Sequence, residues 1–206
     1  MGSYMRNLRD PELKEKTKPS EEQAIEAVKT LISYIGDNPS RIALIDTPKR
    51  VINTYKDFFS GYSSSAAEVL NTTFEDIETD DEMILVKDIR LESHCEHHMI
   101  PIIGEAHIAY IPNKKIVGIS KLARLVDVFA KRLQSQENLT QQIADAINDY
   151  LEPKGVIVLV SAAHQCMTTR GVHKTSTKTT TIASKALFKI DDAKRREFLE
   201  LIKKEM

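Results

Sequence analysis

Two short segments, His94–His98 and His164–Cys166, contain both cysteines and four of the six histidines of this chain. Thiolates and imidazoles are preferred zinc ligands, and a site with three protein ligands leaves a fourth position for water. Neither segment alone supplies enough ligands, so the fold must bring the two together. We therefore expect a catalytic zinc site rather than a structural one, with Cys95, His98 and Cys166 as its ligands.

The ligand assignment depends on spacing. Cys95 and His98 are three residues apart, which suits chelation from one turn, and we expect Cys166 and His164 to share one face of a strand. His97 and His164 then remain beside the metal without binding it, where imidazoles can move protons at neutral pH. Two alternatives stay open: a closed structural zinc that also uses His97 or His164, and a Cys95–Cys166 disulfide.

Basic residues near predicted helix starts form a second candidate site. Lys121 and Arg124 lie one turn apart after Ser120, which we expect to cap a helix, and a helix N-terminus attracts anions. Arg50 occupies the first turn of an earlier predicted helix, and Arg170 follows the Cys166 segment. Single cations on a helix surface are usually solvated, but the placement of these four favours a polyphosphate pocket.

Gln136 and Glu137 stand just before another predicted helix and offer an amide and a carboxylate. A carboxylate can accept two N–H donors from the amidine edge of a purine. An ordinary glutamate in the first turn of a helix explains Glu137 equally well.

The composition excludes several classes of protein. With 29 basic and 30 acidic residues and a net charge of -1, the chain has no global positive field for nucleic acid. No segment approaches the ~20 apolar residues of a membrane span, and the start lacks the pattern of a signal peptide. We expect a cytoplasmic protein with no nucleic-acid or membrane partner. Two cysteines do not make a disulfide framework.

Hydrophobic periodicity predicts a mixture of helices and strands. A capping box at Ser20 and Gln23 opens a helix that stops at Gly36, and Thr47-Pro48 opens a second helix towards Gly61. We interpret residues 63–81 as a loop with room for one helical turn.

The second half predicts two strands, two helices and two more strands, followed by a closing helix. Apolar stripes define the helices, Leu122 to Phe129 in the one capped by Ser120 and Leu139 to Tyr150 in the next. The order of elements predicts an α+β fold with antiparallel pairing. The predicted strands are residues 83–89, 105–111, 156–166 and 178–188, and the closing helix is 191–204.

Several motifs in matching order resemble those of the GTP cyclohydrolase I family. The resemblance extends from Asp46–Val51 to the closing helix, which is nearly everything beyond the tail. The motifs that carry it are Ser93–His98, Ala109–Pro112, Gly118–Arg124, Gln136–Thr140, His164–Cys166 and Arg170–Val172.

The resemblance implies a tunnelling fold, an antiparallel sheet with helices packed on one face, preceded by an N-terminal helical segment. It implies a flexible tail over residues 1–18 and a GTP cyclohydrolase I domain over 19–206, with N-terminal helices in 19–62 and the tunnelling-fold core in 83–206. The implied reaction is zinc-dependent conversion of GTP to 7,8-dihydroneopterin triphosphate and formate, the first step of tetrahydrofolate and pterin biosynthesis. The implied assembly is a homodecamer of two stacked pentamers, with one zinc per subunit and active sites between subunits.

The resemblance also implies residue roles. It agrees with the zinc ligands assigned above, and it gives His164 the proton for N7 of the purine and His97 proton transfers at the ring and ribose. Glu137, assisted by Gln136, would hold the guanine edge. The triphosphate would bind Arg50, Lys121, Arg124 and Arg170, with Ser120 near the sugar–phosphate end.

Two rival classes share these features: a zinc-stabilised binding module without turnover, and another tunnelling-fold enzyme acting on a purine or pterin. His94 departs from the small or apolar residue that the family usually carries there. We expect it to be a surface histidine, with a role in tuning the zinc as the alternative.

Overall fold

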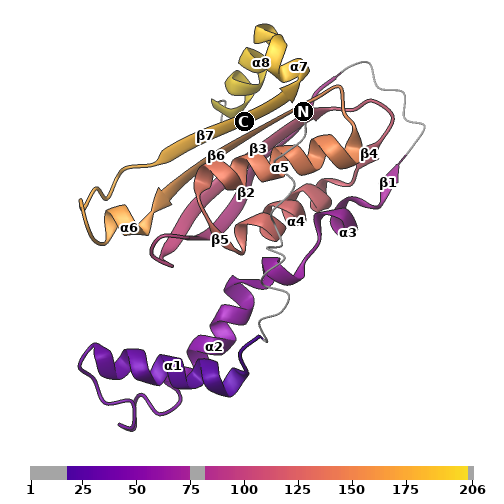
Figure 1. The fold of residues 1–206 in the computed structure, drawn as a ribbon. Helices are drawn as coiled ribbons and strands as arrows, with labels where there is room; N and C mark the ends of the chain where they lie inside the picture. The colour runs from indigo at the N-terminus through magenta and orange to yellow at the C-terminus, as the bar shows by residue number, and fades with distance from the viewer. Residues whose placement is uncertain (1–17, 75–81, 204–206) are drawn as a thin grey trace. The chain divides into compact units, whose positions relative to one another are not determined.

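The computed structural model describes residues 18–74 and 82–203 (Figure 1). The chain divides into two compact units, residues 1–56 and 57–206. Apart from Lys18, the tail predicted for residues 1–18 lies outside the described residues. Within the described ranges, no helix combines the length and the apolar character needed to cross a membrane.

The first unit consists of helix α1 (Glu21–Tyr34) and most of helix α2 (Thr47–Phe58). The predicted capping box is confirmed, because the Gln23 amide donates to Ser20 Oγ at 3.2 Å and the Ser20 amide donates to Gln23 Oε1 at 2.9 Å. Lys56 joins the two helices through an ion pair with Glu21 at 2.8 Å.

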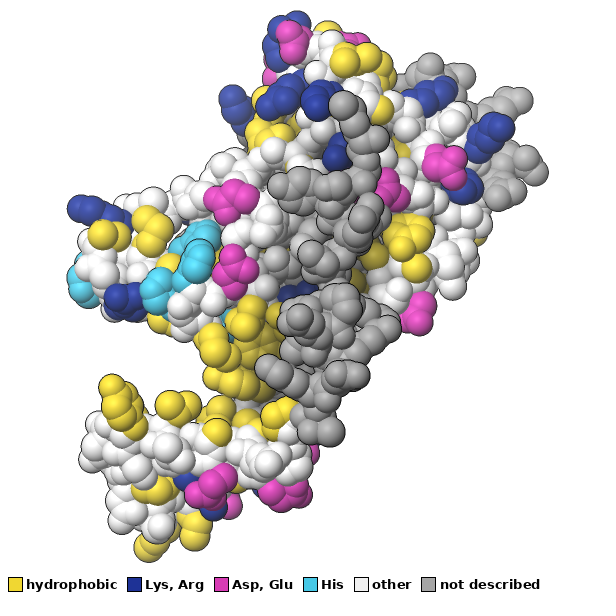
Figure 2. Space-filling model, viewed as in Figure 1, with side chains coloured by type: hydrophobic (Ala, Val, Ile, Leu, Met, Phe, Trp, Pro, Cys, Tyr) yellow, Lys and Arg dark blue, Asp and Glu magenta, His cyan; other side chains and the backbone are white. Residues whose placement is uncertain are grey.

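This unit leaves much of its apolar surface uncovered. Val28 and Ile32 are buried, but Ile42 is 94% exposed. Apolar side chains are conspicuous on the surface of this unit in Figure 2. The exposed members of this set are Leu31, Tyr34, Ile35, Ile42 and Ile45.

A five-stranded sheet forms the centre of the second unit, in the order β5-β2-β3-β6-β7. All neighbours are antiparallel except β2 and β5, which are parallel. The strands are β2 (Ile84–Cys95), β3 (Pro101–Ile111), β5 (Leu133–Gln134), β6 (Gly155–His164) and β7 (Thr179–Ala186).

Helices α4 (Ile119–Ala130) and α5 (Gln136–Leu151) pack on one face of this sheet (Figure 1). Their apolar stripes meet the inward residues of β3, so the larger core lies between helices and sheet. The fully buried side chains of this core include Ala106, Ile108, Tyr110, Leu122, Leu125, Val126, Leu139, Ile143 and Ile147.

The opposite face of the sheet carries a smaller core. Helices α7 (Leu187–Ile190) and α8 (Asp192–Lys203) bring Phe188 and Phe198 against Ile111 and Ile157. The predicted α+β class with antiparallel strands is therefore confirmed, and α7 and α8 add a second covered surface.

Short elements complete the unit. The 3₁₀ helix η3 (Ser60–Ser63) and helix α3 (Ala66–Leu70) precede strand β1 (Thr73–Phe74), which pairs with β4 (Ile116–Val117). Helix α3 is the single turn expected between residues 63 and 81, although residues 75–81 lie outside the described part of the chain. Strand β1 is too short to leave a periodic signal.

Two predicted helix starts were wrong. Helix α4 begins at Ile119 with Gly118 as N-cap, because the Lys121 amide donates to the Gly118 carbonyl at 2.8 Å; Ser120 therefore lies inside the first turn. Helix α5 begins at Gln136, so Gln136 and Glu137 belong to its first turn instead of preceding it.

Two other details also differ from the predictions. Tyr150 is 42% exposed, and Leu151, four residues after Ile147, takes the buried position at the end of α5. The strand predicted to reach Cys166 ends at His164, and Cys166 lies in the short helix α6 (Gln165–Thr168). The strand ends there because the chain turns, with the Thr169 amide donating to the Gln165 carbonyl at 2.9 Å.

Candidate active site

The order of the strands explains how the two cysteine segments meet. Strand β3 lies between β2 and β6, and its residue Ile102 pairs with Ser93 on one side and with His164 on the other. Because both neighbours run antiparallel to β3, their C-terminal ends lie beside its start. The segments after Cys95 and after His164 therefore leave the same end of the sheet, where α6 packs against β3.

A tight turn presents the first two predicted ligands. The Cys95 amide donates to the Ile100 carbonyl and the Met99 amide donates to the Cys95 carbonyl, both at 2.8 Å. Met99 has a positive φ of 55°, which reverses the chain into β3. Cys95 itself is 5% exposed at the end of its strand, and His98 is exposed one turn later.

The predicted metal ligands converge. The donor atoms of Cys95, His98 and Cys166 all lie within 4.8 Å of one another, and Cys95 Sγ is 3.8 Å from His98 Nδ1. Both cysteines are free thiols. Burial, and then the neighbouring sulfur of Cys95, raises the pKa of Cys166. Two thiols and an imidazole crowded together form a donor set that fits a soft divalent cation.

Two of the other histidines of these segments, His97 and His164, stand outside this set of three donors. The His97 side chain is 70% exposed, with Nδ1 at 3.7 Å from Cys95 Sγ and Nε2 at 3.8 Å from Glu96 Oε1. His164 Nε2 is 2.8 Å from Gln136 Oε1. Histidine side chains gather at this end of the second unit in Figure 2.

The surroundings of His164 include charged groups. Burial lowers the pKa of His164, while the carboxylate of Glu137 acts in the opposite direction. Glu137 is exposed in the first turn of α5, and Arg170 is exposed just after α6, where its charge favours the thiolate of Cys166. Glu137 and Arg170 therefore lie at the same end of the sheet as Cys95, His98 and Cys166, the candidate metal-binding set.

The other predicted phosphate ligands lie elsewhere in the chain. Ser120 and Lys121 occupy the start of α4, whereas its far end leads to β5, whose Gln134 pairs with Cys95. This 12-residue helix spans about 18 Å along its axis, so Ser120 and Lys121 lie at the end of α4 away from the turn that leads into β5. Arg50 belongs to the first unit, where it is largely exposed and 3.5 Å from Asp46.

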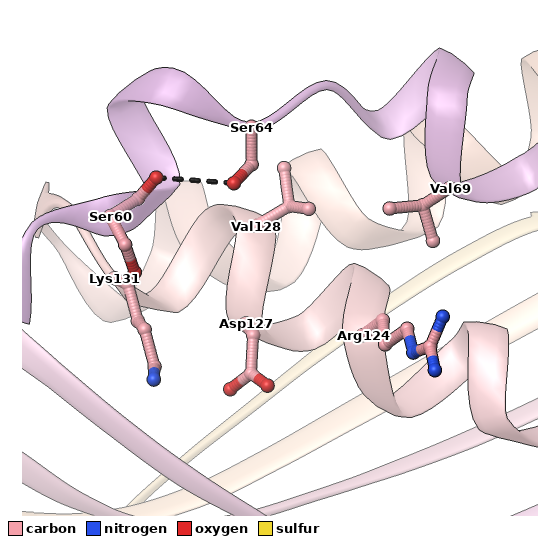
Figure 3. Close-up of a pocket in the computed structure, with 7 residues that line it drawn as sticks. All are labelled: Ser60, Ser64, Val69, Arg124, Asp127, Val128 and Lys131. Carbon is pink, nitrogen blue, oxygen red and sulfur yellow. Dashed lines mark hydrogen bonds between the residues drawn. The ribbon is translucent and has the colours of Figure 1, made fainter. Parts of the chain in front are cut away.

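Arg124 lines a pocket of about 290 Å³ between η3, α3 and α4 (Figure 3). Asp127 and Lys131 lie on the same face of the helix and also line the pocket, so the site has charges of both signs. Across from them, Ser64 Oγ donates to the Ser60 carbonyl at 3.1 Å.

The expectation of a surface position for His94 was wrong. Its ring is 6% exposed and packs against Phe58 and Phe59, with ring centroids at 4.6 Å and 5.1 Å. Because side chains alternate along a strand, His94 faces away from Cys95. The two phenylalanines are remote from His94 in the sequence and contact it only in the folded chain. The sequence alone therefore does not reveal the burial of His94.

A second convergent set was not predicted. Asp88, Glu105 and His107 place donor atoms within 4.8 Å of one another. His107 is buried and its Nδ1 accepts a hydrogen bond from the Asp88 amide at 3.2 Å, at an irregularity in the pairing of β2 with β3. Glu105 and His107 are two residues apart on one strand and therefore share a face of the sheet. This spacing is the feature of the sequence from which the set could have been predicted.

The largely antiparallel sheet backed by α4 and α5, with soft donors at the end of β2 and just after β6, defines an α+β protein with a candidate metal site. Comparison with known proteins gives the family. The family model of GTP cyclohydrolase I matches residues 24–203. The chain therefore belongs to the GTP cyclohydrolase I family.

Curated relatives named GTP cyclohydrolase 1 cover nearly the whole chain. The protein from Maricaulis maris is 51% identical over 188 residues, 91% of this chain and 92% of the relative. The protein from Bartonella quintana is 47% identical over 196 residues, 95% of each chain. A solved structure, the archaeosine synthase QueF-Like in the apo form, is 19% identical and covers 52% of this chain and 95% of its own, with a TM-score of 0.43.

Proposed function

We propose that this protein converts GTP to 7,8-dihydroneopterin triphosphate and formate, the first step of tetrahydrofolate and pterin biosynthesis. The observation that carries the proposal is the meeting of Cys95, His98 and Cys166 beside His164 and Glu137, in a chain of the GTP cyclohydrolase I family. Hydrolytic opening of a purine is promoted by a Lewis acid, by proton-transfer groups and by a residue that holds the base, and we assign these three tasks to side chains at this end of the sheet.

We propose zinc as the metal, one per subunit, held by Cys95, His98 and Cys166. Two thiolates and one imidazole suit zinc, and the absence of a fourth converging donor among the described residues is compatible with an open position. Zinc in such a site supplies a Lewis acid and lowers the pKa of water towards neutrality.

The two neighbouring histidines would move protons. His164 delivers a proton to N7 of the purine, which makes C8 more electrophilic and favours hydrolytic opening of the ring. His97, exposed beside Cys95, serves the later proton transfers at the ring and the ribose.

The substrate would be held at its two ends. The Glu137 carboxylate accepts two N–H groups of the guanine amidine edge. The triphosphate is bound by cations, of which Arg170 lies near Cys166. The remaining proposed phosphate ligands are Arg50, Lys121 and Arg124, with Ser120 near the sugar–phosphate end.

The location of these ligands supports a site shared between subunits. Ser120 and Lys121 lie at the start of α4, whereas the end of this helix leads into β5, whose Gln134 pairs with Cys95, so we propose that a neighbouring copy supplies them. The exposed apolar residues of the first unit offer further surface for assembly. We propose a homo-oligomer, a decamer of two pentamers, located in the cytoplasm.

Incubation of the purified protein with GTP tests the proposal. We expect formate release and a product that becomes a fluorescent pterin after oxidation, both lost on chelation and restored by zinc. Binding of GTP without turnover would instead indicate a zinc-stabilised binding module. Turnover of a different purine or pterin, with GTP left intact, would indicate another tunnelling-fold enzyme.

A further inference from the structure

We propose that Gln136 is a positioning residue that keeps a proton on Nε2 of His164, so that His164 exchanges protons with the substrate only through Nδ1. The inference rests on the proposed function, in which His164 is a proton donor. It gives Gln136 a role different from the guanine contact that the family resemblance implies.

The orientation of the Gln136 amide follows from its partners. Its Nε2 atom lies 2.9 Å from the Thr179 carbonyl and 3.1 Å from the Val160 carbonyl. Backbone carbonyls only accept hydrogen bonds, so the atom that faces both must be the amide nitrogen. The opposite orientation would place three oxygens against one another in a buried position, with no hydrogen between them.

The tautomer of His164 follows from that orientation. The remaining amide atom, Gln136 Oε1, lies 2.8 Å from His164 Nε2. A carbonyl oxygen only accepts, so His164 Nε2 must carry the hydrogen. The neutral ring therefore has its lone pair on Nδ1, and the charged ring keeps the same Nε2–H bond. In both states Nδ1 is the atom that gains or loses a proton.

Three elements fix the amide in place. Gln136 is fully buried in the first turn of α5, where Ser135 caps the helix and accepts from the Asn138 amide at 3.3 Å. Its two N–H groups face β6 and β7, including Thr181 Oγ1 at 3.1 Å. With both N–H groups engaged, the side chain has no donor left for the guanine, so its effect on the reaction passes through His164.

The substitution Gln136→Met tests the role, because methionine has a similar length and no amide. We expect kcat for GTP to fall at least about tenfold, and by no more than the ~10²–10⁴-fold contribution of the proton-transfer group itself, with KM within about twofold and metal content unchanged. A residue that touches guanine would raise KM instead.

Gln134→Met is the matched control. Gln134 is also buried, and its amide donates to the Phe129 carbonyl at 2.8 Å and to Gln142 Oε1 at 2.9 Å, without contacting His164. We expect it to keep kcat. An equal loss of kcat in both variants would mean that burying any methionine here is harmful and would overturn the inference, as would an unchanged kcat in Gln136→Met.

Neutron diffraction of the deuterated wild-type protein measures the proton directly and does not depend on whether Gln136→Met folds. We expect deuterium on His164 Nε2; deuterium on Nδ1 alone would refute the assignment. This measurement also separates the two proposals. Wild-type protein that does not hydrolyse GTP contradicts the proposed function, whereas the tautomer is still read from the neutron map.

Discussion

Single side chains at the end of the sheet carry the proposed chemistry, and Cys166 provides the simplest test. We expect Cys166→Ser to lose both bound metal and turnover, because a serine hydroxyl is a poor zinc ligand and the remaining turn supplies only Cys95 and His98. Metal analysis of the purified variant, together with a formate assay, measures both effects.

Thr168→Ala is a suitable control for that experiment. Thr168 lies in the same short helix and donates to Gln165 Oε1 at 2.8 Å, but it offers no donor to the metal-binding set. It should retain the metal. A Cys166→Ser protein with one firmly bound metal per subunit would show that the ligand set is wrong.

His164→Ala should separate metal binding from catalysis. His164 is outside the set of three converging donors, so the variant should keep its metal. Ring opening should slow by about 10²–10⁴-fold, the usual contribution of a general acid or base. Single-turnover measurements with GTP would check this, and wild-type rates in the variant would exclude His164 from proton transfer.

His107 should make the stability of the protein depend on pH. Burial lowers its pKa, and its Nδ1 accepts from the Asp88 amide, an arrangement that needs the neutral ring. Below pH ~6.5 His107 is protonated in the unfolded chain but stays neutral in the folded chain. The free energy of unfolding should therefore fall as the pH drops through that value.

Denaturant unfolding at pH 7.5 and 5.5 tests this effect. His107→Gln should be less stable at the higher pH but lose less stability between the two values. Burial also lowers the pKa of His94 and His164, so part of the wild-type dependence will remain. Identical losses in wild type and variant would show that His107 does not contribute.

At the level of elements, the close approach of β3 and β6 depends on Gly104. A Cβ atom there would lie 2.1 Å from the Ser161 carbonyl oxygen and 2.6 Å from Ala162 Cβ. Gly104→Ala should therefore cost about 1–3 kcal/mol or more in the free energy of unfolding, as overpacking of a well-packed core does.

Gly118→Ala serves as the steric comparison, because an added Cβ at Gly118 would meet only Lys121 Cγ at 3.9 Å, and we expect only the cost of alanine at this N-cap, about 1 kcal/mol or less. Thermal denaturation of both variants would measure the difference. Equal melting temperatures for Gly104→Ala and wild type would mean that β3 and β6 accommodate the added Cβ without loss of stability.

The sequence predicted the type of most elements but not their ends. Apolar stripes such as Leu122 to Phe129 identify a buried helix face, because burial imposes the helical period. The start of α4 and the end of β6 are set by single backbone hydrogen bonds, which leave little trace in composition. Consequently the strand position predicted for Cys166 was wrong, since it lies on α6, although its donor atom still converges with those of Cys95 and His98.

At the scale of the whole molecule, the separation of Lys121 from His164 predicts that two defective chains can complement each other. Lys121→Ala and His164→Ala should each be nearly inactive alone. In randomly mixed oligomers made by co-expression, about a quarter of the sites would receive both intact residues from different chains. Recovered GTP turnover near that fraction would support shared sites.

A mixture of His164→Ala and Cys166→Ser is the control. These two residues lie two positions apart in the same chain, so no site of the mixture receives both intact, and we expect GTP turnover only at about the background rate. Absence of rescue in the first mixture, with mixed oligomers shown to form, would mean that each chain completes its own site. The residue types of the candidate site could thus be predicted from the sequence, whereas the proposal that it is shared between chains rests on the length and direction of α4.

The central sheet has two unfinished sides in the described residues. Strand β2 pairs with β5 only at His94 and Cys95, and β7 has no neighbour beyond β6. The backbone N–H and C=O groups of alternate residues along Ile84–Ser93 and Thr180–Ala186 therefore face outward. Copies that join these rows would continue one hydrogen-bonded ladder from chain to chain. Strong dilution should then weaken hydrolysis in proportion to dissociation, long before any chain unfolds.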